Sequence, residues 1–376
     1  MKAGALFLAA VVAAFVPQAF AKPVTDCPLR DAPFSIDSPL LDIMLSDAAR
    51  GVLSQQSGAR VQAGPPRPQD LKPPTFIATI SVRTSTRFTG LKTEDLPAID
   101  RALRAVPVTQ ADRVARCARY DNDVPQFKLP KGKPRLLLFE KINGFKDVPS
   151  VDAARAALVA MAERKGWALA ITDKGGAFNP ATLRQFDAVI WNNISGDVLT
   201  LSQRRAFKAY LENGGGFVGI HGSGGDPSYA WDWYADTLLG ARFLAHPHDP
   251  QFQDAKIIVD PSHPLSSSLP ATWTMNDEWY SFRTNPRKAG AKVLLALDES
   301  TYKPVGSGGL NLRMGDHPLA WTNCVGPVGR QQGRMFYSAI GHRPETYSEP
   351  RNVAMLEAAI GWTASPARRC SYDPKP

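Results

Sequence analysis

A histidine at the end of an apolar, glycine-flanked segment is the first candidate for chemistry. Residues 214–220 are predicted to end a helix and form a short buried strand, which runs into His221 and the glycine-rich residues 222–225. An α/β sheet presents a functional side chain at the carboxyl end of a strand in this way, and the familiar forms of the turn carry a Ser or Cys nucleophile. With His221 in that place, acyl transfer through Ser or Cys is not expected. We predict a functional role for His221, and a hydrogen-bonded histidine at a strand end is the alternative.

A second histidine follows the last predicted strand. His342 lies in the segment Gly-His-Arg-Pro-Glu of residues 341–345, and Glu345 is near enough in sequence to orient it. Asp277 and Glu278 form an acidic pair before two aromatic residues, and an aromatic wall can raise the pKa of a carboxyl group into the range of a general acid. A surface acidic pair is the alternative. The predicted catalytic residues are His221, His342, Glu278, Asp277 and Glu345.

Polar and aromatic residues near the predicted strand ends suit a carbohydrate. Residues 192–197 follow a predicted strand and offer amides, a hydroxyl and a carboxylate, although a plain turn is the alternative. Aromatic residues interleaved with acids occur at 231–234 and 273–280, and they match sugars, whose faces are apolar and whose edges carry hydroxyls. Core packing would explain at least half of these aromatic residues. The predicted ligand-contacting residues are Asn193, Ser195, Asp197, Trp231, Tyr280 and His317.

The histidines also allow a metal site. The chain has six of them, and His221, His317 and His342 stand at or beside predicted strand ends. With Asp277 or Glu278 they could supply the roughly three or four ligands that Zn²⁺ or a similar divalent ion needs. The sequence has no H-E-x-x-H or other tightly spaced motif, so a metal-free acid–base site is the alternative.

The N-terminus predicts export. Residues 1–21 contain Lys2, an apolar run at 5–16 and the cleavage pattern Ala-Phe-Ala at 19–21, which together are typical of a secretory signal peptide. The apolar run is too short for a comfortable membrane span, so an uncleaved anchor is the less favoured alternative. We predict a mature chain from Lys22 in the periplasm or outside the cell, with no membrane attachment after cleavage.

The cysteine pattern agrees with export. Four cysteines lie in the predicted mature chain, and an even number after a signal peptide favours disulfides over free thiols. Four cysteines allow three disulfide connectivities. We predict Cys27–Cys117 and Cys324–Cys370, because each pair would close one predicted domain. None of the four belongs to a C-x-x-C pair, so a metal site built on cysteine is not expected.

Length and charge bound the architecture and the partners. Removal of residues 1–21 leaves 355 of the 376 residues, which suggests two domains. Loss of Lys2 lowers the net charge from +9 to +8, and the basic residues are scattered without aromatic interleaving, so no nucleic-acid partner is expected. We predict a mainly helical module at 22–130, an α/β domain at 131–366 and a tail at 367–376. The module would pack on the α/β domain or make a dimer contact, which allows for a homo-oligomer.

After a linker at residues 128–134, apolar strands alternate with helices. The predicted strands are residues 135–140, 167–171, 186–191, 217–221, 291–297, 318–322 and 334–340. The predicted helices are 151–164 with Ser150 as cap, 203–213 with Ser202 as cap, and 351–362, with 38–51 and 93–103 in the module. Continuous apolar strands between helices predict an α/β fold with a doubly wound, mostly parallel sheet of the flavodoxin-like type, covered on both faces.

Taken together, these motifs resemble the ThuA-like (trehalose-utilisation) family, whose fold is similar to that of class I glutamine amidotransferases. The matching residues are 144–145, 193–199, 214–221, 231–234, 246–247, 263–264, 277–280, 285–286, 297–300, 317–322 and 341–342. The resemblance covers about residues 133–364. Amidotransferases carry a Cys at the position that His221 resembles, so glutaminase activity is not expected. Relatives often have Arg-His where this chain has Lys146-Asp147, so any role of that histidine falls to Asp147 or is lost.

The resemblance implies a role in the use of disaccharides or glycosides, including oxidised 3-keto sugars. We therefore predict an exported hydrolase or lyase whose ligand is a small carbohydrate. A non-catalytic carbohydrate-binding protein with the same pocket is the alternative. A third option is a surface or assembly protein in which residues 22–130 are the functional part.

Overall fold

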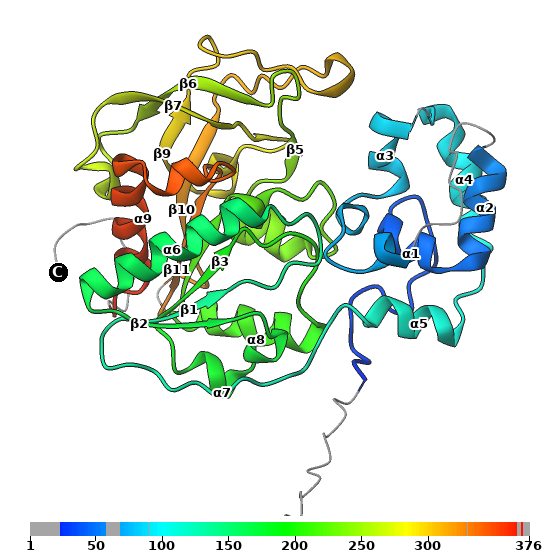
Figure 1. The fold of residues 1–376 in the computed structure, drawn as a ribbon, viewed down its shortest axis with the longest axis horizontal. Helices are drawn as coiled ribbons and strands as arrows, with labels where there is room; N and C mark the ends of the chain where they lie inside the picture. Colours follow the sequence, from blue (N-terminus) through cyan, green and yellow to red (C-terminus); the bar gives the residue numbers. More distant parts are fainter. Residues whose placement is uncertain (1–22, 58–67, 90, 329, 367–369, 371–376) are drawn as a thin grey trace, which may run out of the picture.

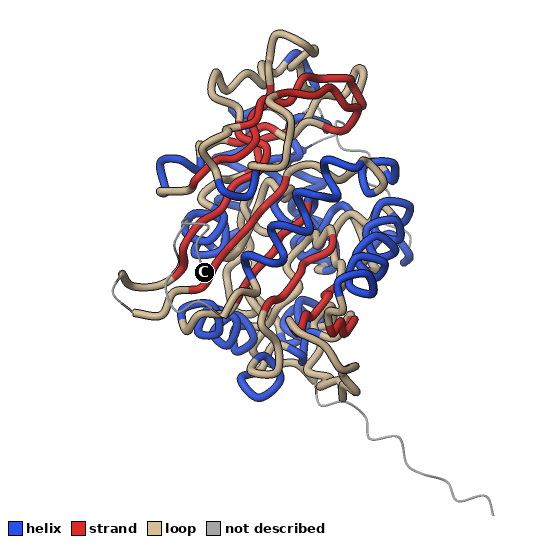
Figure 2. Tube along the Cα trace, turned by 90° about the vertical axis from the view of Figure 1, so that its left-hand side faces the viewer, coloured by secondary structure: helices blue, strands red, loops and turns tan. Residues whose placement is uncertain are grey.

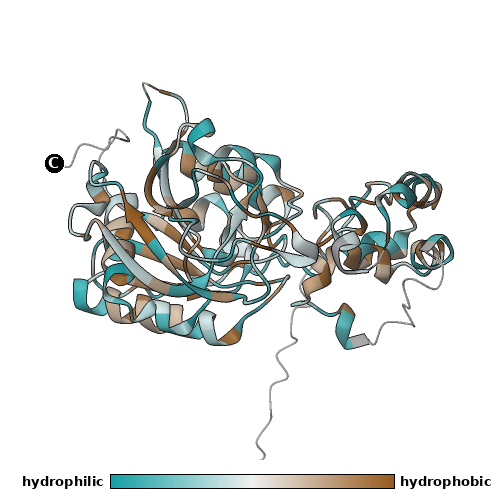
Figure 3. Ribbon diagram, turned by 90° about the horizontal axis from the view of Figure 1, so that it is seen from above, coloured by the Kyte–Doolittle hydropathy of each residue, from teal (hydrophilic) through white to brown (hydrophobic). Residues whose placement is uncertain are grey.

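The computed structural model describes residues 23–57, 68–89, 91–328, 330–366 and 370, so the predicted signal peptide and all but Cys370 of the predicted tail lie outside the described residues. The described residues form two lobes (Figure 1), a helical module from the N-terminal part of the chain and a larger α/β lobe. Seen from above, apolar strands run through the middle of the larger lobe (Figure 3).

One mixed sheet forms the centre of the α/β lobe, and its strands run side by side in the view of Figure 2. Among the described residues it has nine strands in the order β2-β1-β3-β4-β11-β10-β9-β6-β7. The parallel half consists of β2 (Ala168–Thr172), β1 (Arg135–Phe139), β3 (Ala188–Asn192), β4 (Gly216–Ile220) and β11 (Gly333–Ser338). The antiparallel half consists of β10 (Pro318–Val325), β9 (Lys292–Leu297), β6 (Phe252–Val259) and β7 (Thr272–Glu278). A separate pair joins β5 (Phe243–Ala245) to β8 (Ser281–Phe282).

The burial pattern explains which strands the sequence reveals. All five residues of β3 and of β4 are buried, as expected for strands covered on both faces, and such continuous apolar runs are easily recognised. Burial alternates along β6 and most of β7, which is typical of antiparallel strands with one open face. The predicted α/β fold with a mostly parallel sheet is confirmed. Strands β6 and β7 were not predicted, because polar residues on the open face interrupt their apolar pattern.

Helices cover both faces of the parallel half (Figure 1). On one face lie α6 (Val148–Lys165) and α9 (Pro350–Thr363), and Arg164 of α6 pairs with Glu357 of α9 at 2.5 Å. On the other lie α7 (Pro180–Leu183) and α8 (Leu201–Glu212).

Two predicted helix caps were wrong by a few residues. Helix α6 is capped by Asp147, whose side chain accepts a hydrogen bond from the backbone N–H of Ser150. Helix α8 is capped by Thr200, which accepts from the N–H of Gln203. In each case an earlier side chain reaches the free N–H groups of the first turn, so Ser150 and Ser202 lie inside their helices.

The N-terminal module is a small helical bundle with its own apolar core. Its α-helices are α1 (Leu40–Leu45), α2 (Asp47–Ser57), α3 (Val82–Thr89), α4 (Leu96–Arg104) and α5 (Gln110–Cys117). Phe34, Ile43, Val82 and Leu103 are fully buried in this core. The predicted helix at 38–51 is in fact two helices that break at Ser46, and the predicted helix at 93–103 begins with a short 3₁₀ turn before α4.

The module is fastened to the α/β lobe at several points. The backbone N–H of Leu201, the first residue of α8, donates to the carbonyl oxygen of Asp26 at 2.9 Å. The carboxylate of Asp121 pairs with Lys141 at 2.8 Å, just after β1. The N–H of Thr75 donates to the carbonyl oxygen of Asn143 at 3.1 Å, so the module also reaches the loop between β1 and α6.

Both disulfides have the predicted pairing, Cys27–Cys117 within the module and Cys324–Cys370 within the α/β lobe. Disulfides persist in oxidising compartments, so the pair is consistent with a protein outside the cytoplasm. Within the described residues, no helix combines the length and apolar character needed to cross a bilayer.

The module contains a buried ion pair. Arg119 donates to Asp42 at 2.5 Å, and both side chains are almost completely buried. Removal of one partner leaves an uncompensated buried group, so we expect Asp42→Asn and Arg119→Met each to lower the free energy of unfolding by about 3 kcal/mol. In a double-mutant cycle measured by denaturant unfolding, the double variant should lose less unfolding free energy than the two single variants lose in total. Two single variants within about 0.5 kcal/mol of wild type would contradict this.

Candidate functional site

A cavity of about 410 Å³ opens at the carboxyl edge of the parallel strands, and its volume is within the range of small-ligand pockets. The loops after β1, β3, β4 and β11 all contribute to its lining, as expected for the ligand site of a doubly wound sheet. The segment between β5 and β6 and part of the helical module complete the walls. The predicted site residues that line the cavity are Asn193, Ser195, His221, Glu278, Tyr280 and His342.

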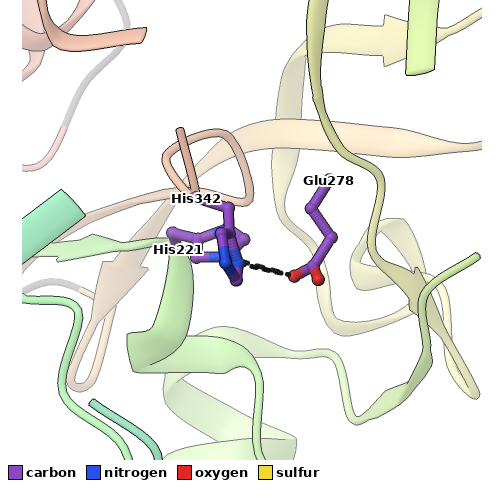
Figure 4. Close-up of side chains that lie close together, drawn as sticks. All are labelled: His221, Glu278 and His342. Atoms are coloured by element: carbon purple, nitrogen blue, oxygen red, sulfur yellow. Dashed lines mark hydrogen bonds and ion pairs between the residues drawn. The ribbon is translucent and has the colours of Figure 1, made fainter. Parts of the chain in front are cut away.

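Three side chains from distant parts of the sequence converge in this cavity (Figure 4). Nε2 of His221 lies 3.3 Å from Nδ1 of His342 and 3.4 Å from Oε2 of Glu278. Nδ1 of His342 lies 3.1 Å from the same Oε2. His221 and Glu278 are buried, and His342 is partly exposed. The three strand ends after β4, β7 and β11 therefore deliver three potential ligand atoms to one point.

The backbone at His221 has the conformation of a sharp strand-to-helix turn. His221 has φ +40°, in the left-handed region that non-glycine residues rarely adopt, and it directly follows β4. Gly341 approaches it from the loop after β11 with φ +145°, and a Cβ at Gly341 would lie 3.0 Å from the Cβ of His221. Such strained positions are typical of functional sites, where the surrounding structure holds them in place.

The hydrogen bond of His221 to a backbone carbonyl determines which of its ring nitrogens is unprotonated in the neutral ring. Its Nδ1 lies 2.7 Å from the carbonyl oxygen of Ala339, and a carbonyl can only accept. The neutral ring therefore carries its hydrogen on Nδ1 and presents a bare Nε2 to His342 and Glu278. The ring also stacks on Tyr280, with ring centroids 4.2 Å apart. His221 is held from two sides, so its Nε2 has a defined direction.

Asp277 positions the loop that carries His342. Its carboxylate is fully buried and accepts the backbone N–H groups of Gly341 at 2.8 Å and of His342 and Arg343 at 3.1 Å. It also accepts from the hydroxyl of Thr346. Burial raises the pKa of Asp277, and the nearby His221 and the N–H donors oppose that shift. The predicted catalytic Asp277 does not line the cavity; it acts on the backbone of the loop.

The electrostatics of the cluster centre on Glu278. Burial works to raise the pKa of Glu278, but the hydrogen bond from His342 and the nearby His246 outweigh burial and hold that pKa well below its ordinary value. Burial alone would lower the pKa of His342, whereas its contact with Glu278 raises it, and the net shift is upward. Nδ1 of His342 is within hydrogen-bond distance of Oε2 of Glu278 and can donate to that carboxylate.

The structure adds His246 to the group. Its Nδ1 lies 3.2 Å from Oε1 of Glu278, and Gln251 donates to the same oxygen at 2.5 Å. Burial lowers the pKa of His246, and Glu278 only partly offsets that effect. His246 was not among the predicted site residues. The repeated histidine at His248, which also lines the cavity, is the signal that could have identified this segment.

Asp226 is a second buried carboxyl group in the cavity wall, and it was not predicted. It accepts hydrogen bonds from the hydroxyl of Ser195 at 2.8 Å and from the N–H of Gly196 at 2.6 Å. Burial raises the pKa of Asp226 to about 7, although both hydrogen bonds work in the opposite direction. Ser195 therefore lies in the cavity as predicted, but its hydroxyl hydrogen is directed to Asp226.

Two other predicted residues lie away from the cavity. His317 is buried, and its ring nitrogens contact Glu299 and the carbonyl oxygen of Tyr280, each at 2.8 Å. The structure therefore does not bring His317 to the cluster as a ligand. Glu345 is exposed and pairs with Arg343, so it does not orient His342.

Asp197 and Trp231 share a different neighbour. Arg204 pairs with the carboxylate of Asp197 at 2.7 Å, and its guanidinium lies over the ring of Trp231 at 5.1 Å. Neither residue lines the cavity, so the structure does not support their predicted contact with a ligand. Asp197 and Trp231 are therefore both engaged by Arg204, one through an ion pair and the other through a cation–π contact.

Comparisons with known proteins agree with this architecture. A family model described as ThuA, trehalose utilisation, matches residues 135–363, which is more than half of the chain. A solved ThuA-like protein from Bacteroides uniformis is similar over 63% of this chain and 95% of its own, with 25% sequence identity and a TM-score of 0.52. A ThuA-like protein from Parabacteroides merdae is similar over 64% and 93%, with 17% identity and a TM-score of 0.46. Among curated proteins, the comparison finds no match.

The raised pKa of Asp226 should make its replacement stabilising at high pH. The folded state holds the proton up to about pH 7, whereas the unfolded chain releases it near 3.8, so wild type loses stability as the pH rises between these values. In Asp226→Asn the amide oxygen can accept from the N–H of Gly196 while the NH2 group donates to the hydroxyl oxygen of Ser195, and the amide does not titrate. We expect the free energy of unfolding of the variant, relative to wild type, to increase by on the order of 2 kcal/mol from pH 5 to pH 8.

Denaturant unfolding at several pH values measures this difference. Glu163→Gln, on the exposed face of α6, is the matched control and should follow wild type across the range. A difference between Asp226→Asn and wild type that stays constant with pH would show that Asp226 is already ionised in the folded protein.

Proposed function

The chain belongs to the ThuA (trehalose utilisation) family, and on this premise we propose that it is an exported enzyme that acts on a disaccharide, glycoside or keto-glycoside. Family membership points to carbohydrate utilisation in general. The more specific proposal is a hydrolase or lyase in which His221, Glu278 and His342 hold a divalent metal ion. The two disulfides support a location outside the cytoplasm.

The spacing of the three ligand atoms is the observation that carries the metal proposal. A tetrahedral zinc site with bonds of about 2.0–2.1 Å places its ligand atoms about 3.3 Å apart. The three separations among His221, Glu278 and His342 are 3.1, 3.3 and 3.4 Å. Two histidines with one carboxylate form a donor set used by catalytic zinc enzymes and by sites for other transition metals, and it leaves a coordination position open.

The second contacts of these ligands fit the same role. A histidine that binds a metal usually donates its other ring N–H to a carbonyl or carboxylate, as His221 does to Ala339. Glu278 is braced by Gln251 on its second oxygen, and Asp277 fixes the backbone of His342. A divalent ion in this place would supply Lewis-acid chemistry to an oxygen of the substrate.

The rest of the cavity provides groups for a carbohydrate. His246, His248 and Gln251 form one polar wall that can donate to and accept from hydroxyl groups, and Phe145 offers a half-exposed ring beside His342. Asp226 lines the same cavity and holds its proton near neutral pH, so it is suited to give a proton to a departing oxygen. This combination of polar groups and one aromatic face matches a sugar ring better than a purely apolar ligand.

Elemental analysis of the purified protein tests the metal site. We expect about one transition-metal ion per chain in wild type and its loss in His221→Ala, His342→Ala and Glu278→Gln, since each removes one of three ligands. His263→Asn is the matched control, because His263 lies outside the cavity and an Asn oxygen can keep its hydrogen bond from Leu265. Absence of metal from wild type after incubation with Zn²⁺, or retention by the three variants, would refute the site.

Turnover separates an enzyme from a carbohydrate-binding protein with the same pocket. Wild type should cleave some member of a panel of glycosides and 3-keto-glycosides, and His221→Ala should lose turnover by 100-fold or more, on the order of that seen when a catalytic group is removed. Calorimetric binding of the same compounds without turnover, in wild type as in the variant, would support the binding protein instead.

A further inference from the structure

The helical module supplies one wall of the cavity, from residues that precede the family match. Phe76 in the 3₁₀ turn Phe76–Ala78, Thr79 and Ile80 just after it, and Thr84 in α3 all line the cavity. The family match begins at residue 135. This wall, which we call the module wall, is therefore a feature of this chain beyond the segment that defines the family.

The module wall is pressed against the loop after β1. The N–H of Thr75 donates to the carbonyl oxygen of Asn143, and the next residue, Gly144, has no room for a side chain: a Cβ there would overlap the Thr79 methyl group and the Ser195 hydroxyl. Phe145 follows, with its N–H bonded to Ser195. The module wall is thus fixed relative to the strand ends that carry the cluster.

The module wall differs in chemistry from the part of the lining that contains His246, His248 and Gln251. The hydroxyl of Thr79 donates to the carbonyl oxygen of Phe76 at 2.8 Å, and the hydroxyl of Thr84 donates to that of Ser81 at 3.2 Å. Both threonines therefore use their hydrogen within the module. What they add to the cavity, together with Phe76 and Ile80, is mainly apolar surface. By contrast, the side chains of His246, His248 and Gln251 add polar groups to the lining.

Two aromatic rings stand out at this cavity. Phe76 is 48% exposed and Phe145 is 50% exposed, although large apolar side chains are usually buried. One comes from the module and the other from the loop after β1, and both line the same cavity. Phe145 stacks near His342, with ring centroids 6.2 Å apart, so one of the two rings borders the cluster. Exposed apolar rings beside a cavity indicate a surface that a ligand covers.

We propose that the module wall is a binding subsite for the apolar aglycone of a glycoside, with the sugar ring on the polar side near the cluster. The proposal rests on the proposed function and specifies its substrate class. Phe76 and Ile80 would pack against an aromatic or alicyclic group, while the polar wall binds the sugar hydroxyls. A glycoside with an apolar aglycone satisfies both sides, whereas a second sugar ring on the module wall would find few hydrogen-bond partners.

The test compares an aryl glycoside with a disaccharide that has the same reacting sugar. Phe76→Ala should lower kcat/KM for the aryl glycoside about 10-fold or more, mainly through KM, and change the disaccharide value less than about 2-fold, because only the aryl group contacts the ring. Phe76→Trp should restore most of the loss. Val114→Ala, at an exposed apolar position of α5 outside the cavity, is the matched control and should leave both values unchanged.

The outcomes separate this proposal from the proposed function. Equal losses for both substrates in Phe76→Ala, or no loss for either, would overturn the aglycone subsite while wild-type turnover left the proposed function intact. Absence of turnover in wild type, for every glycoside tried, would refute the proposed function. Because Phe76 is half exposed, its replacement should leave the thermal midpoint within about 2 °C of wild type, which rules out unfolding as the cause.

Discussion

The buried carboxylate of Asp277 is the interaction on which the site depends. Strands β7 and β11 are separated in the sheet by three others, yet Asp277 at the end of β7 binds three consecutive N–H groups of the loop after β11. Side chains alternate along a strand, so Glu278 points to the opposite side, into the cavity. One strand end therefore places the carboxylate of Glu278 in the cluster and also fixes the loop that brings His342 to it.

The parallel half of the sheet and its helices could be predicted because buried parallel strands leave continuous apolar runs between capped helices. The convergence of His221, His342 and Glu278 could be predicted because the carboxyl ends of the strands meet at one edge, where such folds bind ligands. His246 could not, because it belongs to a short segment beside a two-stranded pair that has no clear period. Glu345 was assigned by closeness in sequence, whereas the group that positions His342 is 65 residues earlier, at Asp277.

Burial also explains which polar residues were misassigned. Asp197 and Trp231 looked suited to a sugar, but a single cation, Arg204, engages both away from the cavity. His317 has the same strand-end placement as the ligand histidines, yet Glu299 and a backbone carbonyl take up both of its ring nitrogens. Asp226 had no motif to mark it, since its raised pKa arises from burial among residues of two separate loops. Sequence spacing reveals the strand end, and only the fold decides which direction the side chain faces.

The disulfide Cys27–Cys117 joins the two ends of the module covalently. The two Cα atoms are 5.3 Å apart, so the disulfide joins the beginning of the module to its end, 90 residues later in the sequence. A segment bounded in this way can be exchanged for another without rethreading the sheet, and the module wall changes with it while the strand ends that carry His221, Glu278 and His342 stay where they are. Sequence change within the module can therefore reshape one wall of the cavity while the cluster keeps its geometry.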